Sequence, residues 1–345
     1  MKTRRVVIGI LGAVLIVAGG IVAYRHWQSQ DGSGRREEML SLLPADPSTV
    51  VFLDLEQFRK SSFLPQLLAW VSHNSVEDDY AQFVKETGFN YERDLDRVAV
   101  ASIRQGANSK SYAIAEGRFD RKKLEEYARR NGQSISEKGL PVFSVNLKNS
   151  ARPSYFTFLR NDRIGWTDDP AYAGLFLRNA GYAGKRDWQE HFERLAGSAV
   201  FAVIREDATT AAALEQQAPG GFRSPQLATL LNQLQWITIA GRPEEDNLRV
   251  VIEGEGGTES ALNQLKDLLQ GILVMAQMGL NGAQNRKQMN PQLREAYLEL
   301  LKSAEVEKVD RGTGKSVRVL FLITPGFLEA MKKASGPGAA GGALK

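Results

Sequence analysis

The feature that most restricts how this chain can fold is an uncharged apolar run, VVIGILGAVLIVAGGIVAY, from Val6 to Tyr24. As a helix this run would span roughly 28 Å, about the thickness of the hydrocarbon core of a bilayer. A secretory signal has a shorter apolar region of about 7–15 residues and a small-residue cleavage site. Ile21-Val22-Ala23 could serve as that site, but the length of the run favours an uncleaved, single-pass transmembrane anchor over residues 6–24.

The charges beside this run predict its orientation. Lys2, Arg4 and Arg5 precede it, whereas Arg25 alone follows it directly. By the positive-inside rule, residues 1–5 are a cytoplasmic basic N-terminus and the body is extracytoplasmic. We therefore expect the body of the protein on the outer side of the membrane that the anchor spans.

Small residues in the run allow a second prediction. Gly9 and Ala13, then Gly19 and Ala23, have the small-xxx-small spacing that lets membrane helices approach closely. A homodimer through the anchor helix is therefore an open alternative to a monomer.

The basic isoelectric point of about 9.1 belongs to the membrane end and does not indicate a nucleic-acid partner. Residues 1–36 hold six Lys and Arg against Asp31 alone, a net charge of +5, and the whole chain carries +4. Residues 37–345 therefore sum to −1. A nucleic-acid binder would carry its positive excess on the folded domain.

Composition excludes several catalytic and metal-binding classes. The 345-residue chain has no Cys, which rules out disulfides, thiolate metal sites and catalytic thiols. Its three His (His26, His73 and His191) are widely separated, so no His-x-x-x-His zinc motif exists, and none lies near a Gly-x-Ser-x-Gly elbow. We predict no catalytic, cofactor-binding or metal-ligating residues and no cofactor.

Two segments without apolar periodicity flank the body. Residues 25–42, with Gly32, Ser33 and Gly34 near the centre, predict a flexible tether. Residues 334–345, rich in Gly and Ala, predict a disordered tail.

Between these segments the order of apolar patterns predicts an α+β fold with largely antiparallel sheets and flanking helices. Strands are expected at STVVFLDL, RVAVASI, SYAIAEGRF, LPVFSVN, SYFTFLR and RIGWT, and then at SAVFAVIRE, LQWITIAG, LRVVIEGEG, VEKVD and SVRVLFLI. Helices are expected around Leu64–Val71, after the capping residues Asp120, Thr258, Asn290 and Thr324, and over DDPAYAGLFLRN.

The second half repeats the order of the first, which predicts two tandem related modules, residues 43–180 and 181–333. AIAEGRFDRKKLEEY and VIEGEGGTESALNQL both run strand, Glu-Gly, cap, helix. Pro65-Gln66-Leu67 and Pro225-Gln226-Leu227 precede the middle strands of the two halves. Chance similarity of amphipathic segments is the alternative explanation.

The start of the body resembles a family. Leu43-Pro44-Ala45-Asp46 leads into a hydrophobic strand that ends in Asp54-Leu55, after an anchor and a polar segment. This arrangement resembles bacterial single-pass, membrane-anchored extracytoplasmic proteins of unknown function that open with a Leu-Pro-Ala-Asp motif. The match covers about fifteen residues. The resemblance implies a location, a bacterial inner or cytoplasmic membrane with the body on the periplasmic side, and a type of architecture. It carries no catalytic residues.

The two carboxylates of this stretch are expected to serve the backbone. Asp46, beside Pro44 and Pro47, can accept N–H bonds in an Asx-turn. Asp54 ends the strand and can cap the following turn. The two residues stand at opposite ends of one strand, roughly 25 Å apart, so they cannot form one catalytic pair.

Two glycine motifs resemble nucleotide-binding loops only in part. RGTGKS, residues 311–316, lacks the first Gly of a phosphate-binding loop and precedes a strand, which indicates a hairpin turn. EGEGGTES, residues 253–260, lacks the dinucleotide spacing and carries Glu255, which would repel phosphate. We expect a strand-to-helix turn there.

Residues 271–290 hold three of the six Met and almost no acid. An exposed Met-rich helix end could bind varied partners. We favour the other interpretation, a long helix with a Met-filled core and a loose loop. The sequence as a whole predicts a membrane-tethered binding or scaffold protein with an unknown protein or envelope partner and no enzymatic motif. The alternative is a cell-envelope enzyme, or its accessory subunit, whose acid/base site leaves no local signature.

Overall fold

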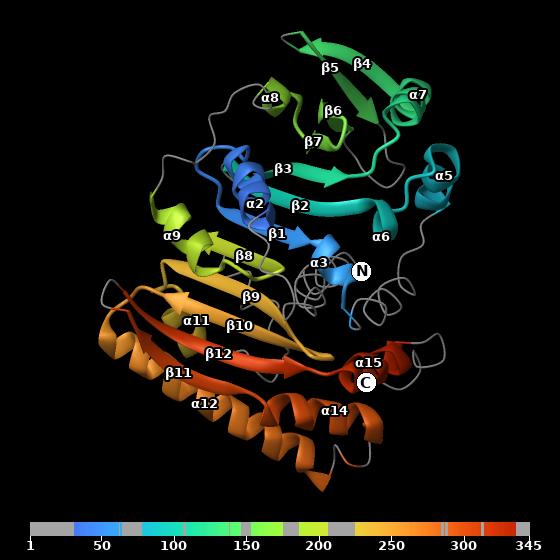
Figure 1. The fold of residues 1–345 in the computed structure, drawn as a ribbon. Helices are drawn as coiled ribbons and strands as arrows, with labels where there is room; N and C mark the ends of the chain where they lie inside the picture. Colours follow the sequence, from blue (N-terminus) through green and yellow to red (C-terminus); the bar gives the residue numbers. More distant parts are fainter. Residues whose placement is uncertain are drawn as a thin grey trace. The chain divides into compact units, whose positions relative to one another are not determined.

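The computed structural model describes residues 31–61, 63, 78–105, 108–137, 139–145, 153–174, 186–205, 225–283, 286, 289–311 and 314–335 (Figure 1). The predicted anchor over residues 6–24, the predicted helix around Leu64–Val71 and most of the predicted tail lie outside these residues. Within them, no helix combines the length and the apolar character needed to cross a bilayer.

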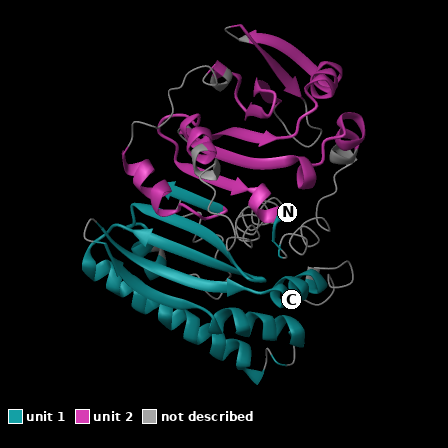
Figure 2. Cartoon of the chain, viewed as in Figure 1, with its two compact units in different colours: residues 1–25, 60–73, 200–345 teal, residues 26–59, 74–199 magenta. Residues whose placement is uncertain are grey.

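The chain divides into two compact units, coloured in Figure 2. Unit 2 comprises residues 26–59 and 74–199, and unit 1 comprises residues 1–25, 60–73 and 200–345. Both units combine antiparallel strands with helices, as the α+β prediction requires.

In unit 2 the strands lie in the order β1-β2-β3-β7-β6-β5-β4, and every neighbouring pair is antiparallel. The described elements are α2 (Asp31–Ser41), β1 (Thr49–Asp54), α3 (Leu55–Arg59), α5 (Asp78–Thr87), α6 (Tyr91–Asp94), β2 (Leu95–Gln105), β3 (Asn108–Gly117), α7 (Arg121–Asn131), β4 (Gly132–Glu137), β5 (Leu140–Val145), β6 (Ser154–Arg160), β7 (Arg163–Thr167), α8 (Pro170–Ala173) and α9 (Arg186–Arg194).

In unit 1 the strands lie in the order β8-β9-β10-β12-β11, again with antiparallel neighbours. The described elements are β8 (Val200–Arg205), α11 (Pro225–Leu231), β9 (Trp236–Glu244), β10 (Asn247–Glu255), α12 (Glu259–Asn281), α14 (Pro291–Lys302), β11 (Glu305–Asp310), β12 (Lys315–Ile323) and α15 (Pro325–Ser335). The order ends at β11, whose residues alternate between half-buried Val and exposed charges.

The two units follow the same course. The first five positions of unit 2, β1-β2-β3-β7-β6, correspond one by one to β8-β9-β10-β12-β11 of unit 1. A helix with a side-chain cap follows the third strand in each unit: Asp120 caps α7 and Thr258 caps α12. Unit 2 adds the β4–β5 hairpin after this helix, where unit 1 has α14.

Each unit has its own buried apolar residues. In unit 1, Leu262 and Leu265 of α12 pack with Leu234 and Val317 against half-buried side chains of the strands. In unit 2, Phe52 of β1 and Met39 of α2 are fully buried. A smaller cluster joins α7 to β5 through Ala128, Phe143 and Val145.

The structure corrects the expected flexible tether. Residues 31–41, inside the predicted tether over 25–42, form helix α2. The Arg36 guanidinium donates to the carbonyls of Leu195 and Phe192, and the Glu38 carboxylate accepts from Arg163. These tertiary contacts hold a segment whose own sequence has little apolar periodicity.

Two smaller predictions also change. Strand β4 was not predicted, because GQSISE is polar and has only Ile135 as a β-branched residue. The strands expected at LQWITIAG and LRVVIEGEG leave RPEEDN between them as a turn, and the observed turn is shorter, because β9 extends to Glu244 and β10 begins at Asn247. Glu245, with φ of +54°, makes this tight turn in the left-handed region.

Candidate functional site

Asp54 ends β1 and binds two partners within unit 2. Its Oδ1 accepts the backbone N–H of Gln57 at 2.9 Å, and its Oδ2 accepts from Arg97 Nε at 3.0 Å. The side chain is almost fully buried. Burial raises the pKa of Asp54, and the positive charge of Arg97 opposes that rise. The predicted capping role of Asp54 is confirmed, with an ion pair added to it.

Asp46 lies in the turn before β1, with its side chain exposed. Its φ is +67°, in the left-handed region that Asp, Asn and Gly adopt most readily. The backbone conformation thus explains the residue type at this position. The expected Asx-turn bonds of Asp46 stay a prediction.

A row of alternating charges crosses four neighbouring strands of unit 2. Asp54 on β1 is paired in register with Arg97 on β2, Arg97 with Glu116 on β3, and Glu116 with Arg163 on β7. Arg163 Nε donates to Glu116 Oε1 at 2.9 Å, and Arg97 Nη1 lies 3.7 Å from Glu116 Oε2. All four side chains are buried, so each charge is compensated by its neighbours and not by water.

Two helices add acids to this charge row. Glu56 of α3 accepts from Arg97 at 2.5 Å, and Glu38 of α2 accepts from Arg163 at 2.7 Å. The hydrogen bond from Arg163 lowers the pKa of Glu38. The row therefore fixes α2 and α3 to the strands of unit 2.

Unit 1 holds a related cluster around Glu253 on β10. Its carboxylate accepts from Arg311 Nη2 at 2.8 Å, from Ser316 Oγ at 2.7 Å and from Arg318 Nη2 at 3.1 Å. Burial works to raise the pKa of Glu253, but the donors Arg311 and Ser316 and the nearby positive charges outweigh it and lower the pKa to about 2. Glu253 stays ionised at neutral pH.

The Glu253 carboxylate is organised for stability and not for proton transfer. A carboxylate bound by several cationic and hydroxyl donors is a weak base, because the same donors that stabilise its charge oppose its protonation. Across the described ranges no group of His, Cys, Asp and Glu side chains is placed to hold a metal ion. His191 is buried, with Nδ1 2.6 Å from the carbonyl oxygen of Asp187.

Both glycine motifs have the structure expected from the sequence. Strands β11 and β12 form a hairpin around RGTGKS, and Lys315 binds Glu259 at 2.7 Å. Gly256 and Gly257 adopt positive φ values of 107° and 74° between β10 and α12, which makes EGEGGTES a strand-to-helix turn. At Gly256 and Gly257 the positive φ accounts for the glycines without a bound phosphate.

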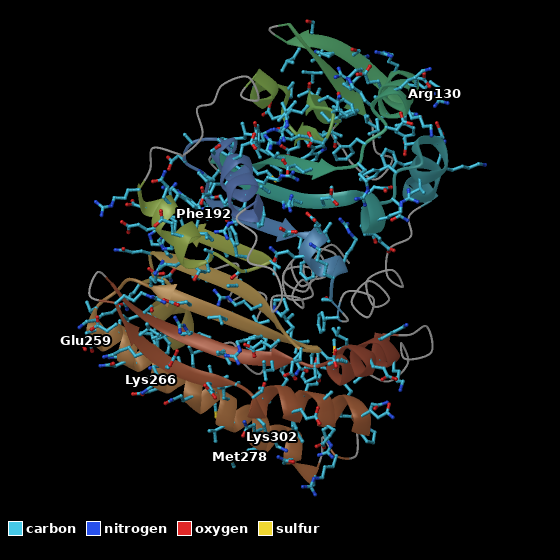
Figure 3. The ribbon with its side chains drawn as sticks, viewed as in Figure 1. Arg130, Phe192, Glu259, Lys266, Met278 and Lys302 are labelled. Carbon is cyan, nitrogen blue, oxygen red and sulfur yellow. The ribbon has the colours of Figure 1, made fainter. Side chains whose placement is uncertain are left out.

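The exposed apolar surface of the described residues is concentrated on α12. Val274, Met275 and Met278 are 55%, 63% and 69% exposed, and the one other large exposed hydrophobic in the described residues is Ile135. Met278 lies near the C-terminal end of α12 (Figure 3). We call Val274, Met275 and Met278 the α12 apolar face. The core interpretation of residues 271–290 therefore fails for these side chains.

Sequence reasoning missed the charge row and the Glu253 cluster, although a signal existed. Arg97, Glu116 and Glu253 each stand inside or beside an apolar strand pattern, where a charged residue needs a partner. The Glu-Gly pairs at 116–117 and 253–254 entered the argument only as marks of a repeat.

No protein-family model and no curated protein sequence matches the chain. Among solved structures, the chain is similar to TP0453 in its crystal forms III, IV and I, with TM-scores of 0.47, 0.46 and 0.46. The sequence identities are 9%, 8% and 7%. The superpositions cover 86%, 86% and 85% of this chain and 98%, 96% and 96% of TP0453. Such values transfer no activity, ligand or partner.

Proposed function

We propose that this protein is tethered to a bacterial membrane by residues 6–24 and acts outside the cytoplasm as a binding or scaffold protein. The observation that carries the binding role is the α12 apolar face, where three large side chains more than half exposed lie within five residues. Isolated exposed hydrophobics are ordinary, but a contiguous group marks an interaction surface. Met side chains suit this role because they are flexible and polarizable.

The charged residues favour binding over catalysis. Asp54, Glu116 and Glu253 are buried carboxylates with hydrogen-bond acceptor sites already used by Arg side chains, so they hold the strands and helices of each unit. The proposal therefore assigns the buried charges to stability and the α12 apolar face to function.

The location is supported by the charge pattern around residues 6–24 and by the Leu-Pro-Ala-Asp resemblance. It is tested by fusing a reporter that is active only outside the cytoplasm after Lys345. We expect reporter activity in the membrane fraction. Activity in the soluble fraction would mean cleavage of the anchor, and loss of activity would mean the opposite orientation.

We also infer that residues 43–180 and 181–333 are duplicated modules. The shared strand order supports this, and so does a shared chemical detail: Glu116 faces Arg163 across the third and fourth strands of unit 2, as Glu253 faces Arg318 in unit 1. An experimental structure in which the two halves differ in connectivity would contradict the duplication.

The binding role is tested with a photoreactive amino acid in place of Met278 in the full chain, in living cells. We expect covalent adducts that are missing when the same group replaces Lys122, an exposed residue of α7. Equal labelling from both positions would remove the α12 apolar face as the binding surface.

A further inference from the structure

Two glycines of α12 are not explained by packing against any described residue. Gly271 and Gly279 lie in the helix, and a Cβ added to either would meet no described atom within 4 Å. Glycine in a helix interior is destabilising relative to Ala. Because they lack side chains, both positions allow the backbone of another helix to approach α12 closely.

These glycines flank the α12 apolar face. At about 100° per residue, Asp267, Gly271, Val274, Met275 and Met278 lie within an arc of about 100°, with Gly279 about 40° beyond it on the side of Met275. The helix thus presents a protruding Met275 with a gap one turn before it and another one turn after it.

This arrangement is self-complementary about Met275. Gly271 and Gly279 are each four residues from Met275, so an antiparallel copy that crosses at Met275 brings Gly271 opposite Gly279 of the second copy. A two-fold interface requires such a patch, because one surface must serve both partners. Each Met275 then fills space that the glycines leave open.

Charges near the ends of the face agree with the same pairing. Asp267 lies roughly 12 Å before Met275 along the helix axis, and Arg286 follows the end of α12 at Asn281. Antiparallel pairing places each Asp267 beside the C-terminal end of α12 of the second copy, the end that Arg286 follows. Both side chains are exposed, and within the described part of the chain neither forms an ion pair.

The same residues fit a helix better than a lipid surface. Helices that lie on membranes combine Lys and Arg on the polar face with Leu, Phe or Trp on the other. Residues 268–285 contain no Lys or Arg, and two glycines reduce the apolar area of the face. Close approach to the α12 backbone allows a second helix to pack against it, whereas binding to a bilayer does not require such close approach.

We propose that the α12 apolar face pairs two copies of this chain as an antiparallel two-fold contact centred on Met275. The inference rests on the proposed function, because it names the partner of that same surface. One helix pair buries less than the ~1,200 Å² of a standard stable interface. Tethering in one membrane would raise the effective concentration enough for such a contact to form.

The absence of Cys from the sequence gives a direct test. Met275→Cys in the full chain, oxidised in native membranes, should give a disulfide-linked dimer, because the two-fold axis brings the two residues together. The matched control is Ser260→Cys, exposed on the same helix but roughly 22 Å from the axis, which should stay monomeric.

A second variant separates pairing from folding. Gly271→Leu replaces a poor helix former, so the melting temperature should not fall, while the added side chain blocks close approach. In the Met275→Cys background it should lower the cross-linked fraction at least fivefold. An unchanged fraction would overturn the proposed geometry.

The remaining outcomes distinguish the two proposals. Equal dimer from both Cys variants indicates random collision and overturns the pairing. A monomeric Met275→Cys chain whose attached fluorophore is quenched by brominated lipids places the face in the bilayer and also overturns it. If the photoreactive group at Met278 labels other proteins but never a second copy, the binding role stands and the pairing fails. If it labels nothing, both fail.

Discussion

Glu253 on β10 lies opposite Arg318 on β12, and the guanidinium donates to one carboxylate oxygen at 3.1 and 3.2 Å. Glu116 on β3 lies opposite Arg163 on β7 in the same way. In both units the acid is followed by a glycine and then by a capped helix. In each unit the acid–arginine pair therefore joins two neighbouring strands near the point where the chain leaves the strand for the following helix.

The low pKa of Glu253 predicts how stability depends on pH. The folded pKa is about 2 and the ordinary value is 4.5, so the ionised carboxylate stabilises the fold above about pH 4.5. This contribution, about 3 kcal/mol, is lost as the pH falls from 4.5 towards 2. Glu253→Gln should lower the unfolding free energy at pH 7 and flatten its decline over that range.

Urea unfolding at a series of pH values measures this effect. The control is Glu305→Gln, an exposed residue of β11, which should stay within about 0.5 kcal/mol of the parent protein at pH 7. Parallel pH curves for Glu253→Gln and the parent protein would show that the carboxylate is not held by its Arg partners.

Arg97 connects three carboxylates in unit 2, so its loss should be severe. Arg97→Met leaves Asp54 and Glu116 buried without their shared cation, and we expect a loss of about 3–5 kcal/mol in unfolding free energy. Arg186→Met, which removes an exposed pair with Glu190, should cost less than about 1 kcal/mol. Similar losses for the two variants in denaturant melts would contradict the role of the buried row.

The positive φ of Asp46 predicts an order among substitutions. Asp46→Gly should equal or exceed the parent protein in stability, and Asp46→Asn should stay close to it. Asp46→Ala should lose about 1 kcal/mol, because Ala tolerates the left-handed region poorly. Thermal melting of the full chain in detergent compares the three. A Gly variant less stable than the Ala variant would indicate that the side chain matters more than the backbone.

Gly117 should not tolerate a larger side chain. A Cβ at this position would lie 2.2 Å from the carbonyl oxygen of Asp94, a backbone atom that cannot turn aside. Gly117→Ala should therefore cost about 1–3 kcal/mol. Gly326→Ala in α15, where the nearest atom is 3.8 Å away, should be neutral or stabilising. Chemical denaturation of both variants tests whether this close approach is real.

Much of the fold could be predicted because its strands are recognisable from their local sequence. TVVFLD and WITIAGRPE combine β-branched residues with apolar runs, and Asp120, Thr258 and Asn290 are side-chain caps recognisable from sequence. Helix α2 could not be predicted, because its sequence, DGSGRREEMLS, is polar and its stability comes from distant partners of Arg36 and Glu38.

The charge row could not be predicted from the sequence for a related reason. Its four members are spread over more than a hundred residues, and only the strand register brings them into line. Local patterns contain no information about that register. For the Met-rich segment the local sequence favoured a Met-filled core, and the exposure of Met275 and Met278 shows that this prediction was wrong for these two side chains.

The exposed charges of β11 affect how the protein associates at high local concentration. Glu305, Glu307, Lys308 and Asp310 are exposed along the strand that ends the order in unit 1. An incoming strand from a neighbour would have to bury these groups, so edge-to-edge sheet growth is disfavoured. Open-ended polymerisation into fibres through this strand edge is thereby disfavoured.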